Sequence, residues 1–217
     1  MIRSPNTPFG NDPPDSFLTI EGSAESELKV QRSRFLALTF PVRTEQEARV
    51  CLSETARRYH DSRHVCYGYK LGVGSASITR KSDDGEPSGT AGDPILAAIG
   101  KLELTDVLLV VVRYFGGVKL GTGGLARAYG QAGAMALAEA TIREVQLGRE
   151  FMIRFPYSQE KSIRRLLETR GGRLVDQQYG EAVSWRIWLA HSGWRGFAEA
   201  LTELTAGNVD LEEPENQ

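Results

Sequence analysis

The sequence predicts an α+β protein built from two domains. Val107 to Val112 is an unbroken apolar run rich in β-branched residues, which is typical of a strand buried on both faces. A glycine-rich segment and a helical pattern follow this run directly. After Glu144 the strand and helix patterns come in the order β-α-β-β-α-β, which predicts a ferredoxin-like second domain. Because each half has its own set of apolar positions for a hydrophobic core, we expect the halves to fold as separate domains.

Composition suggests where the domains begin and end. Residues 1–17 hold four prolines among polar neighbours, which predicts a flexible N-terminal arm. The first domain is expected over residues 18–142 and the second over residues 143–217. Six acidic residues and no basic residue follow Arg195, so we expect the second domain to end in an acidic tail.

The first domain is expected to open with strands at residues 17–30 and 35–42. Thr44 and Glu47 match a capping box, which predicts a helix with an apolar stripe of Ala48, Cys51, Leu52, Thr55, Ala56 and Tyr59. Two further strands, at residues 65–73 and 75–80, are joined at a glycine pair, and a short helix runs from about Pro94 to Lys101. The central strand follows, and then a helix from Leu125 whose apolar face comprises Leu125, Ala128, Tyr129, Ala132, Met135, Ala136 and Ala140.

The second domain is expected to begin with a strand at residues 149–156, in which Phe151, Ile153 and Phe155 alternate with polar residues. A helix after Ser158 ends at a glycine pair, and strands follow at residues 173–179 and 183–190. The pattern closes with a short strand near residues 208–212, after a helix from Ser192 whose inward residues are Trp194, Phe197, Ala198, Leu201 and Leu204.

Composition also narrows the class of protein. The 26 basic and 28 acidic residues give a net charge of −2, so any nucleic-acid site requires a local basic surface. The two cysteines form no disulfide framework, and there is no signal peptide or membrane-spanning apolar run. We expect a cytoplasmic monomer with no membrane contact and no cofactor.

The glycine segment, residues 113–127, is the main candidate site. It combines three cations with five glycines: Arg113, Lys119, Arg127, Gly116, Gly117, Gly121, Gly123 and Gly124. Backbone N–H groups at a helix start attract anions, so the segment is a candidate anion site; alternatively, its glycines serve only tight packing. Residues 121–126 also match a dinucleotide fingerprint, but their distance from the strand end and the absence of further parallel strands argue against nicotinamide binding. No P-loop is present.

The acidic loop, residues 82–92, is a second candidate. Asp83, Asp84 and Glu86, with Ser88 nearby, offer oxygen ligands for a hard cation, or form a solvated turn that pairs with neighbouring cations. His60, His64 and Cys66 have a spacing that suits zinc only within a continuous helix, which the sequence does not support. His64 is instead expected to form a hydrogen bond at a strand start. We expect no metal site.

A third candidate is a basic face in the second domain. Residues 143–173 hold eight basic and four acidic residues. The cations Lys161, Arg164, Arg165, Arg170 and Arg173 either form a solvated helix face or meet phosphates.

Two long motifs extend these patterns to a known family. The chain resembles the IMPACT/YigZ family in residues 82–92 with the following Pro94-Ile-Leu, in residues 112–129, and in His64-Val-Cys66. The resemblance covers about residues 18–140 in detail, and it departs from the family at Asp93, where a basic residue is usual. It implies a first domain like domain 2 of ribosomal protein S5, followed by the ferredoxin-like domain. It also implies a role in translation regulation, as in the eukaryotic members.

Two functions follow as hypotheses. The first is a non-enzymatic, translation-associated regulator that binds the ribosome, RNA or a translation factor through the glycine segment, helped by the basic face. The second is a nucleotide- or phosphate-binding enzyme of the small-molecule-kinase-like fold, with a cation at the acidic loop. The second ranks lower because no P-loop and no nucleophile can be identified.

Overall fold

The structure, a computed structural model, describes residues 14–212. Most of the expected N-terminal arm and the end of the expected acidic tail lie outside these residues. The part of the arm that is described is ordered in the fold: Ser16–Glu21 forms strand β1, and Asp15 accepts a 2.8 Å hydrogen bond from the Ser192 N–H.

The chain divides into two compact units. One comprises Phe17–Val145, and the other comprises the described residues from Gln146 onward together with those before Phe17. Each unit has its own buried apolar core, and both combine helices with sheets. The chain is therefore a two-domain α+β protein.

The first unit is organised around a five-stranded sheet in which every neighbouring pair is antiparallel. The sheet has the order β2-β3-β6-β4-β5, where the strands are β2 (Ala24–Val30), β3 (Ser33–Pro41), β6 (Val107–Tyr114), β4 (His64–Leu71) and β5 (Ile78–Ser82). β6 is central, and the whole run from Val107 to Val112 is fully buried, as its sequence predicts. A separate two-stranded sheet joins β1 to β7 (Thr141–Gln146).

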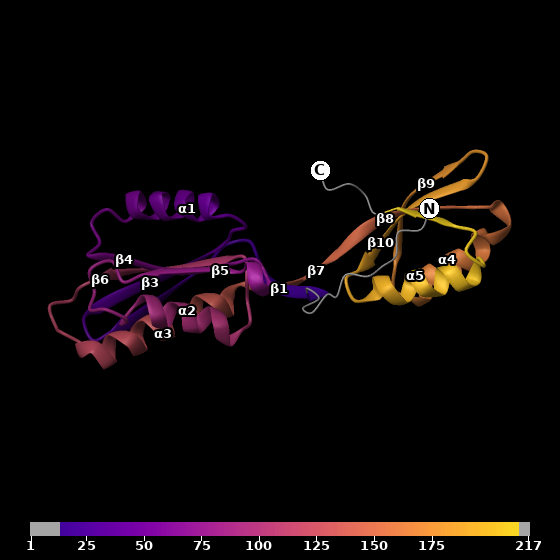
Figure 1. Ribbon diagram of the computed structural model, residues 1–217. Coiled ribbons are helices and arrows are strands. Elements are labelled where there is room, and N and C mark those ends of the chain that lie inside the picture. Colours follow the sequence, from indigo (N-terminus) through magenta and orange to yellow (C-terminus); the bar gives the residue numbers. More distant parts are fainter. Residues whose placement is uncertain (1–13, 213–217) are drawn as a thin grey trace. The chain divides into compact units, whose positions relative to one another are not determined.

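Helices cover both faces of this sheet (Figure 1). Helix α1 (Glu45–Arg58) lies on one face, and helices α2 (Gly92–Lys101) and α3 (Gly121–Glu139) lie on the other. Thr44 caps helix α1 as expected, because its Oγ1 accepts the Glu47 N–H at 3.1 Å, but the Glu47 carboxylate accepts the Arg43 N–H at 2.6 Å and not the Thr44 N–H of a full capping box. A single-turn 3-10 helix, η1 (Gly74–Ala76), precedes β5.

Helix α3 begins at Gly121, four residues before the predicted start at Leu125. Glycine weakens a helix by about 0.5–1 kcal/mol relative to alanine, so the sequence favours a loop here. The burial of Leu125, Ala128 and Tyr129 against the sheet outweighs that preference. Gly121, Gly123 and Gly124 therefore belong to the first turn of a helix.

The second unit is a four-stranded antiparallel sheet with helices α4 and α5 on one face (Figure 1). Its strand order is β11-β8-β10-β9. In chain order the elements are β8 (Gly148–Phe155), the 3-10 turn η2 (Tyr157–Gln159), α4 (Glu160–Thr169), β9 (Arg173–Tyr179), β10 (Val183–Ala190), α5 (Gly193–Leu204) and β11 (Asp210–Glu212).

Three residues predicted to face inward are exposed. They are Ala56 in α1, Met135 in α3 and Leu204 in α5. Each extends an apolar stripe beyond the width that the neighbouring sheet covers, since a helix buries only one stripe of its surface. Within the described residues, no helix is long and apolar enough to cross a membrane.

Candidate functional site

The glycine segment connects the central strand to α3. Residues 115–120 form the connection, and Gly116 lies against the turn between β2 and β3. An added Cβ at Gly116 would lie 2.0 Å from the carbonyl carbon and oxygen of Arg32, so only glycine fits there. Gly117 has a positive φ of 83° but open space around it. The two glycines are therefore required for different reasons, close approach and backbone conformation.

Arg113, at the end of β6, forms a buried ion pair with Glu86 of the acidic loop. Arg113 Nη1 donates to Glu86 Oε1 at 2.6 Å, and the two side chains are only 5% and 4% exposed. Arg113 Nη2 also lies 3.4 Å from Ser33 Oγ, which in turn accepts the Gly116 N–H at 3.3 Å. The ion pair thus joins the acidic loop to the start of the glycine segment.

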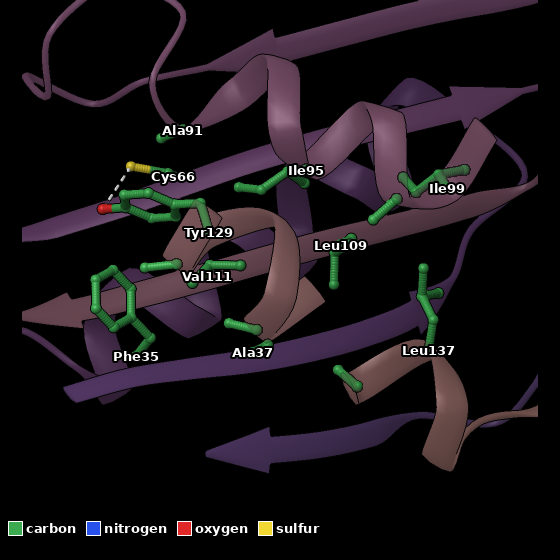
Figure 2. Packing of buried hydrophobic residues seen from close by; sticks show 14 of the residues in the cluster. Phe35, Ala37, Cys66, Ala91, Ile95, Ile99, Leu109, Val111, Tyr129 and Leu137 are labelled. Atoms are coloured by element: carbon green, nitrogen blue, oxygen red, sulfur yellow. Dashed lines mark hydrogen bonds between the residues drawn. The ribbon is translucent and has the colours of Figure 1, made fainter. Parts of the chain in front are cut away.

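Tyr129 of α3 also contacts this buried ion pair, through its hydroxyl group. Its hydroxyl donates to Glu86 Oε1 at 2.8 Å, and its ring meets Phe35 edge to face at a centroid distance of 5.1 Å. Figure 2 shows Tyr129 between Phe35 and Cys66, whose Sγ lies 3.4 Å from the hydroxyl. Burial raises the pKa of the Cys66 thiol to about 12 and raises the pKa of Tyr129 above its ordinary value. Burial and the raised pKa both disfavour the thiolate of Cys66, which is the reactive form of cysteine.

Backbone N–H groups hold the two aspartates of the acidic loop. Asp83 accepts three hydrogen bonds of 2.8–2.9 Å from the N–H groups of Gly89, Ala91 and Gly92. Burial acts to raise the pKa of Asp83, but these donors lower it below its ordinary value. Asp84 Oδ2 accepts the Val65 N–H at 2.6 Å. The loop is therefore closed around Asp83, whereas Asp84 and Ser88 are exposed.

His64 lies beside the ion pair. Its Nδ1 is 2.6 Å from the Asp84 carbonyl oxygen, so Nδ1 carries a proton and donates, as predicted for a hydrogen-bonded histidine at a strand start. Its Nε2 is 3.8 Å from Glu86 Oε1. Within residues 14–212, no group of three or more His, Cys, Asp and Glu side chains is arranged to hold a metal ion. His60, His64 and Cys66 do not converge, nor do Asp83, Asp84 and Glu86.

Comparisons with known proteins match both halves of the chain. Residues 31–137 match the model of the Impact N-terminal domain, and residues 153–208 match a domain of unknown function, DUF1949. The IMPACT family member YvyE of Bacillus subtilis is 36% identical, over 92% of both chains. The chain belongs to the IMPACT family.

Other IMPACT family members agree over similar lengths. A member from Thermus thermophilus is 39% identical over 84% of this chain and 99% of its own. YigZ of Escherichia coli is 31% identical over 84% and 90%. A crystal structure described as a hypothetical protein is 29% identical, covers 94% of this chain and 99% of its own, and superposes with a TM-score of 0.63.

The glycine segment of this IMPACT family chain contains two further cations, and both are exposed to solvent. Lys119 and Arg127 are exposed, and neither has an ion pair within the described residues. Asp93 pairs with Lys81 on β5. The structure therefore brings Arg113 and Glu86 together, whereas Lys119 and Arg127 make no contact with Asp83 or Asp84.

The predicted basic face of the second domain is partly engaged in packing. Arg164 pairs with Glu160 at 3.2 Å and lies over the Trp185 ring, with 4.6 Å to its centroid. Arg173 lies over the Trp188 ring at 4.1 Å. Lys161, Arg165 and Arg170 are exposed. Among the five candidate cations, these three have no contact with an aromatic ring within the described residues.

Sequence reasoning missed the polar role of Tyr129. The apolar spacing of α3 correctly predicts that its ring is buried, but the hydroxyl of a buried tyrosine requires a hydrogen-bond partner, and that was the available signal. It also missed Ser33, for which no local signal exists.

We expect Tyr129→Phe to lower the free energy of unfolding by about 1.5–3 kcal/mol, because it removes a hydrogen bond to a charged group. Urea denaturation measures this loss. Tyr67→Phe is the control, since the Tyr67 hydroxyl has no hydrogen bond within the described residues. Equal stability of the two variants would contradict the assigned contact.

Proposed function

We propose that this chain is a non-enzymatic, translation-associated regulator that binds ribosomal RNA through the exposed cations of the glycine segment. The observation that carries the proposal is the contrast between Lys119 and Arg127, which are exposed and have no ion pair within the described residues, and Asp83 and Glu86 of the acidic loop, which are hydrogen-bonded inside the fold. Exposed cations without an ion-pair partner among the described residues attract phosphate.

Family membership supports the translation part of the proposal, because the resemblance to the IMPACT family implies a role in translation regulation, as in the eukaryotic members; one relative, from Dictyostelium discoideum, is named Protein IMPACT homolog. We also propose a fold for each of the two domains. The strand order β11-β8-β10-β9 supports a ferredoxin-like domain over residues 143–217, and the resemblance supports a ribosomal protein S5 domain 2-like fold over residues 18–142. The exposed cations of the basic face provide a second phosphate contact.

The geometry favours this function over an enzyme with a cation at the acidic loop. Asp83 is saturated by backbone N–H groups and Glu86 is neutralised by Arg113, so neither carboxylate is directed at a ligand. Cys66 is buried and protonated.

Replacing Lys119 and Arg127 together with alanine tests the proposal. We expect the double variant to bind a ribosomal RNA fragment at least about 10-fold more weakly at low salt, and to lower the salt slope of log K by about 1.5–2. Arg49→Ala plus Arg57→Ala is the matched control, because it removes the same charge from the outer surface of α1.

Fluorescence anisotropy and co-sedimentation with ribosomes provide the two readouts. Equal affinities for the double variant and the control would show that the loss follows net charge alone and would contradict the proposal. An absence of RNA and ribosome binding by the natural chain at low salt would contradict it outright.

A further inference from the structure

Phe115 is a large apolar side chain left exposed at the start of the glycine segment. It is 47% exposed, directly after the buried strand β6. The guanidinium of Arg113 lies under its ring, with 5.4 Å between the guanidinium carbon and the ring centroid. Arg113 is itself fixed, because it binds Glu86 and lies 5.5 Å from the Phe35 ring centroid. One face of Phe115 thus rests on an immobilised cation.

Three further cationic residues belong to backbone segments next to this ring. Arg32 belongs to the turn that touches Gly116, the Arg63 N–H donates to the Arg113 carbonyl oxygen at 3.1 Å, and Lys119 follows within the same connection. All three side chains are exposed and have no ion-pair partner within residues 14–212.

Two nearby acidic groups are held by hydrogen bonds within the fold. Asp61 accepts a 2.8 Å hydrogen bond from the Tyr114 hydroxyl, and Asp84 accepts one from the Val65 backbone. The exposed ring of Phe115 therefore lies in a connection whose neighbouring segments carry three exposed cations without an ion-pair partner among the described residues.

We infer that Phe115 is a stacking platform for an unpaired base, so that the ligand class of this surface is single-stranded RNA. The inference rests on the proposed function and deepens it. Single-stranded nucleic acids bind where aromatic rings stack with bases and cations track the phosphates. A duplex keeps its base faces covered and offers nothing to the ring. A protein partner fits less well, since the buried centres of protein interfaces are depleted of charged residues.

The test compares three probes of equal length: a single-stranded RNA, its duplex, and an abasic strand with the same phosphates. The full chain is expected to bind the single strand at least about 5-fold more tightly than the abasic strand, because base–aromatic stacking contributes at that level. Phe115→Ala is expected to weaken single-strand binding about 5- to 100-fold and to leave abasic-strand binding unchanged. Phe115→Trp is expected to retain single-strand binding, and Phe115→Leu is expected to lose it.

Val118→Ala is the matched control, since Val118 is also an exposed apolar residue of the same connection. Thermal unfolding of each variant separates loss of stacking from loss of fold. Three results would overturn the inference: unchanged binding by Phe115→Ala, equal affinity for duplex and single strand, or equal loss of abasic-strand and RNA binding.

The two proposals fail differently. If Phe115→Ala binds normally while Lys119→Ala plus Arg127→Ala binds weakly, the stacking inference is wrong and the RNA-binding function stands. If the natural chain binds none of the three probes at low salt, both are wrong.

Discussion

Glu86→Ala is expected to lower the free energy of unfolding by about 3–5 kcal/mol, the largest effect we expect from any single side chain of the site. The variant leaves the Arg113 guanidinium buried and without its partner, and it also removes the acceptor of the Tyr129 hydroxyl. The loss comes mainly from the uncompensated buried charge, because an ion pair that is left intact contributes little net stability once desolvation is counted. Urea denaturation monitored by tryptophan fluorescence measures it.

Asp93→Ala provides the matched control for this prediction. Asp93 pairs with Lys81, but these side chains are 54% and 45% exposed, so water screens the pair and its removal costs about 0–1 kcal/mol. Arg113→Met, Glu86→Leu and their combination form a double-mutant cycle. The double variant is expected to lose less stability than the sum of these two single changes, since no charge stays buried alone. A loss for Glu86→Ala no greater than for Asp93→Ala would show that the buried pair is unimportant.

Gly116→Ala is expected to destabilise the first domain by about 3 kcal/mol, at the upper end of the usual cost of overpacking. Its Cβ would lie 2.0 Å from the carbonyl atoms of Arg32, and backbone atoms cannot rotate aside as a side-chain tip can. The turn between β2 and β3 has to move, and the hydrogen bond from Gly116 to Ser33 is lost with it.

Gly117→Ala separates this steric effect from backbone conformation. Its φ is 83°, but nothing lies within 4 Å of its added Cβ, so only the left-handed backbone penalty of about 1–2 kcal/mol applies. Differential scanning calorimetry of both variants gives the comparison. Equal losses of stability would mean that the close approach at Gly116 relaxes without cost.

The sequence predicts the frame of the fold well because its strongest signals are periodic. The burial of Val107 to Val112 and the limits of β10 follow from an apolar run and from alternation. It misplaces the start of α3 because local glycine propensity and tertiary packing compete there, and packing wins. Leu204 shows the opposite error, a helical apolar position that no neighbouring element covers.

The site is less predictable because its contacts join distant segments. Arg113 and Glu86 each stand out in the sequence, but they are 27 residues apart, and no local pattern pairs them. The same limit applies to Asp83, whose carboxylate suits a cation by composition but is taken by backbone N–H groups that only the folded loop presents. The roles of Lys119 and Arg127 stay predictions until binding is measured.

The buried pairing of Glu86 with Arg113 also constrains how this chain can evolve. Replacing one partner leaves the other charge buried and uncompensated, which is expected to cost stability. Replacing both with apolar residues is expected to cost less. The effect of a substitution at one position therefore depends strongly on the residue at the other. A lineage has to cross a poorly folded intermediate to change them. Positions such as Lys119, exposed and unpaired among the described residues, face no such barrier. Positions in the acidic loop and the glycine segment are therefore tied together by folding, while Lys119, close to Arg113 in the chain, can change independently of them.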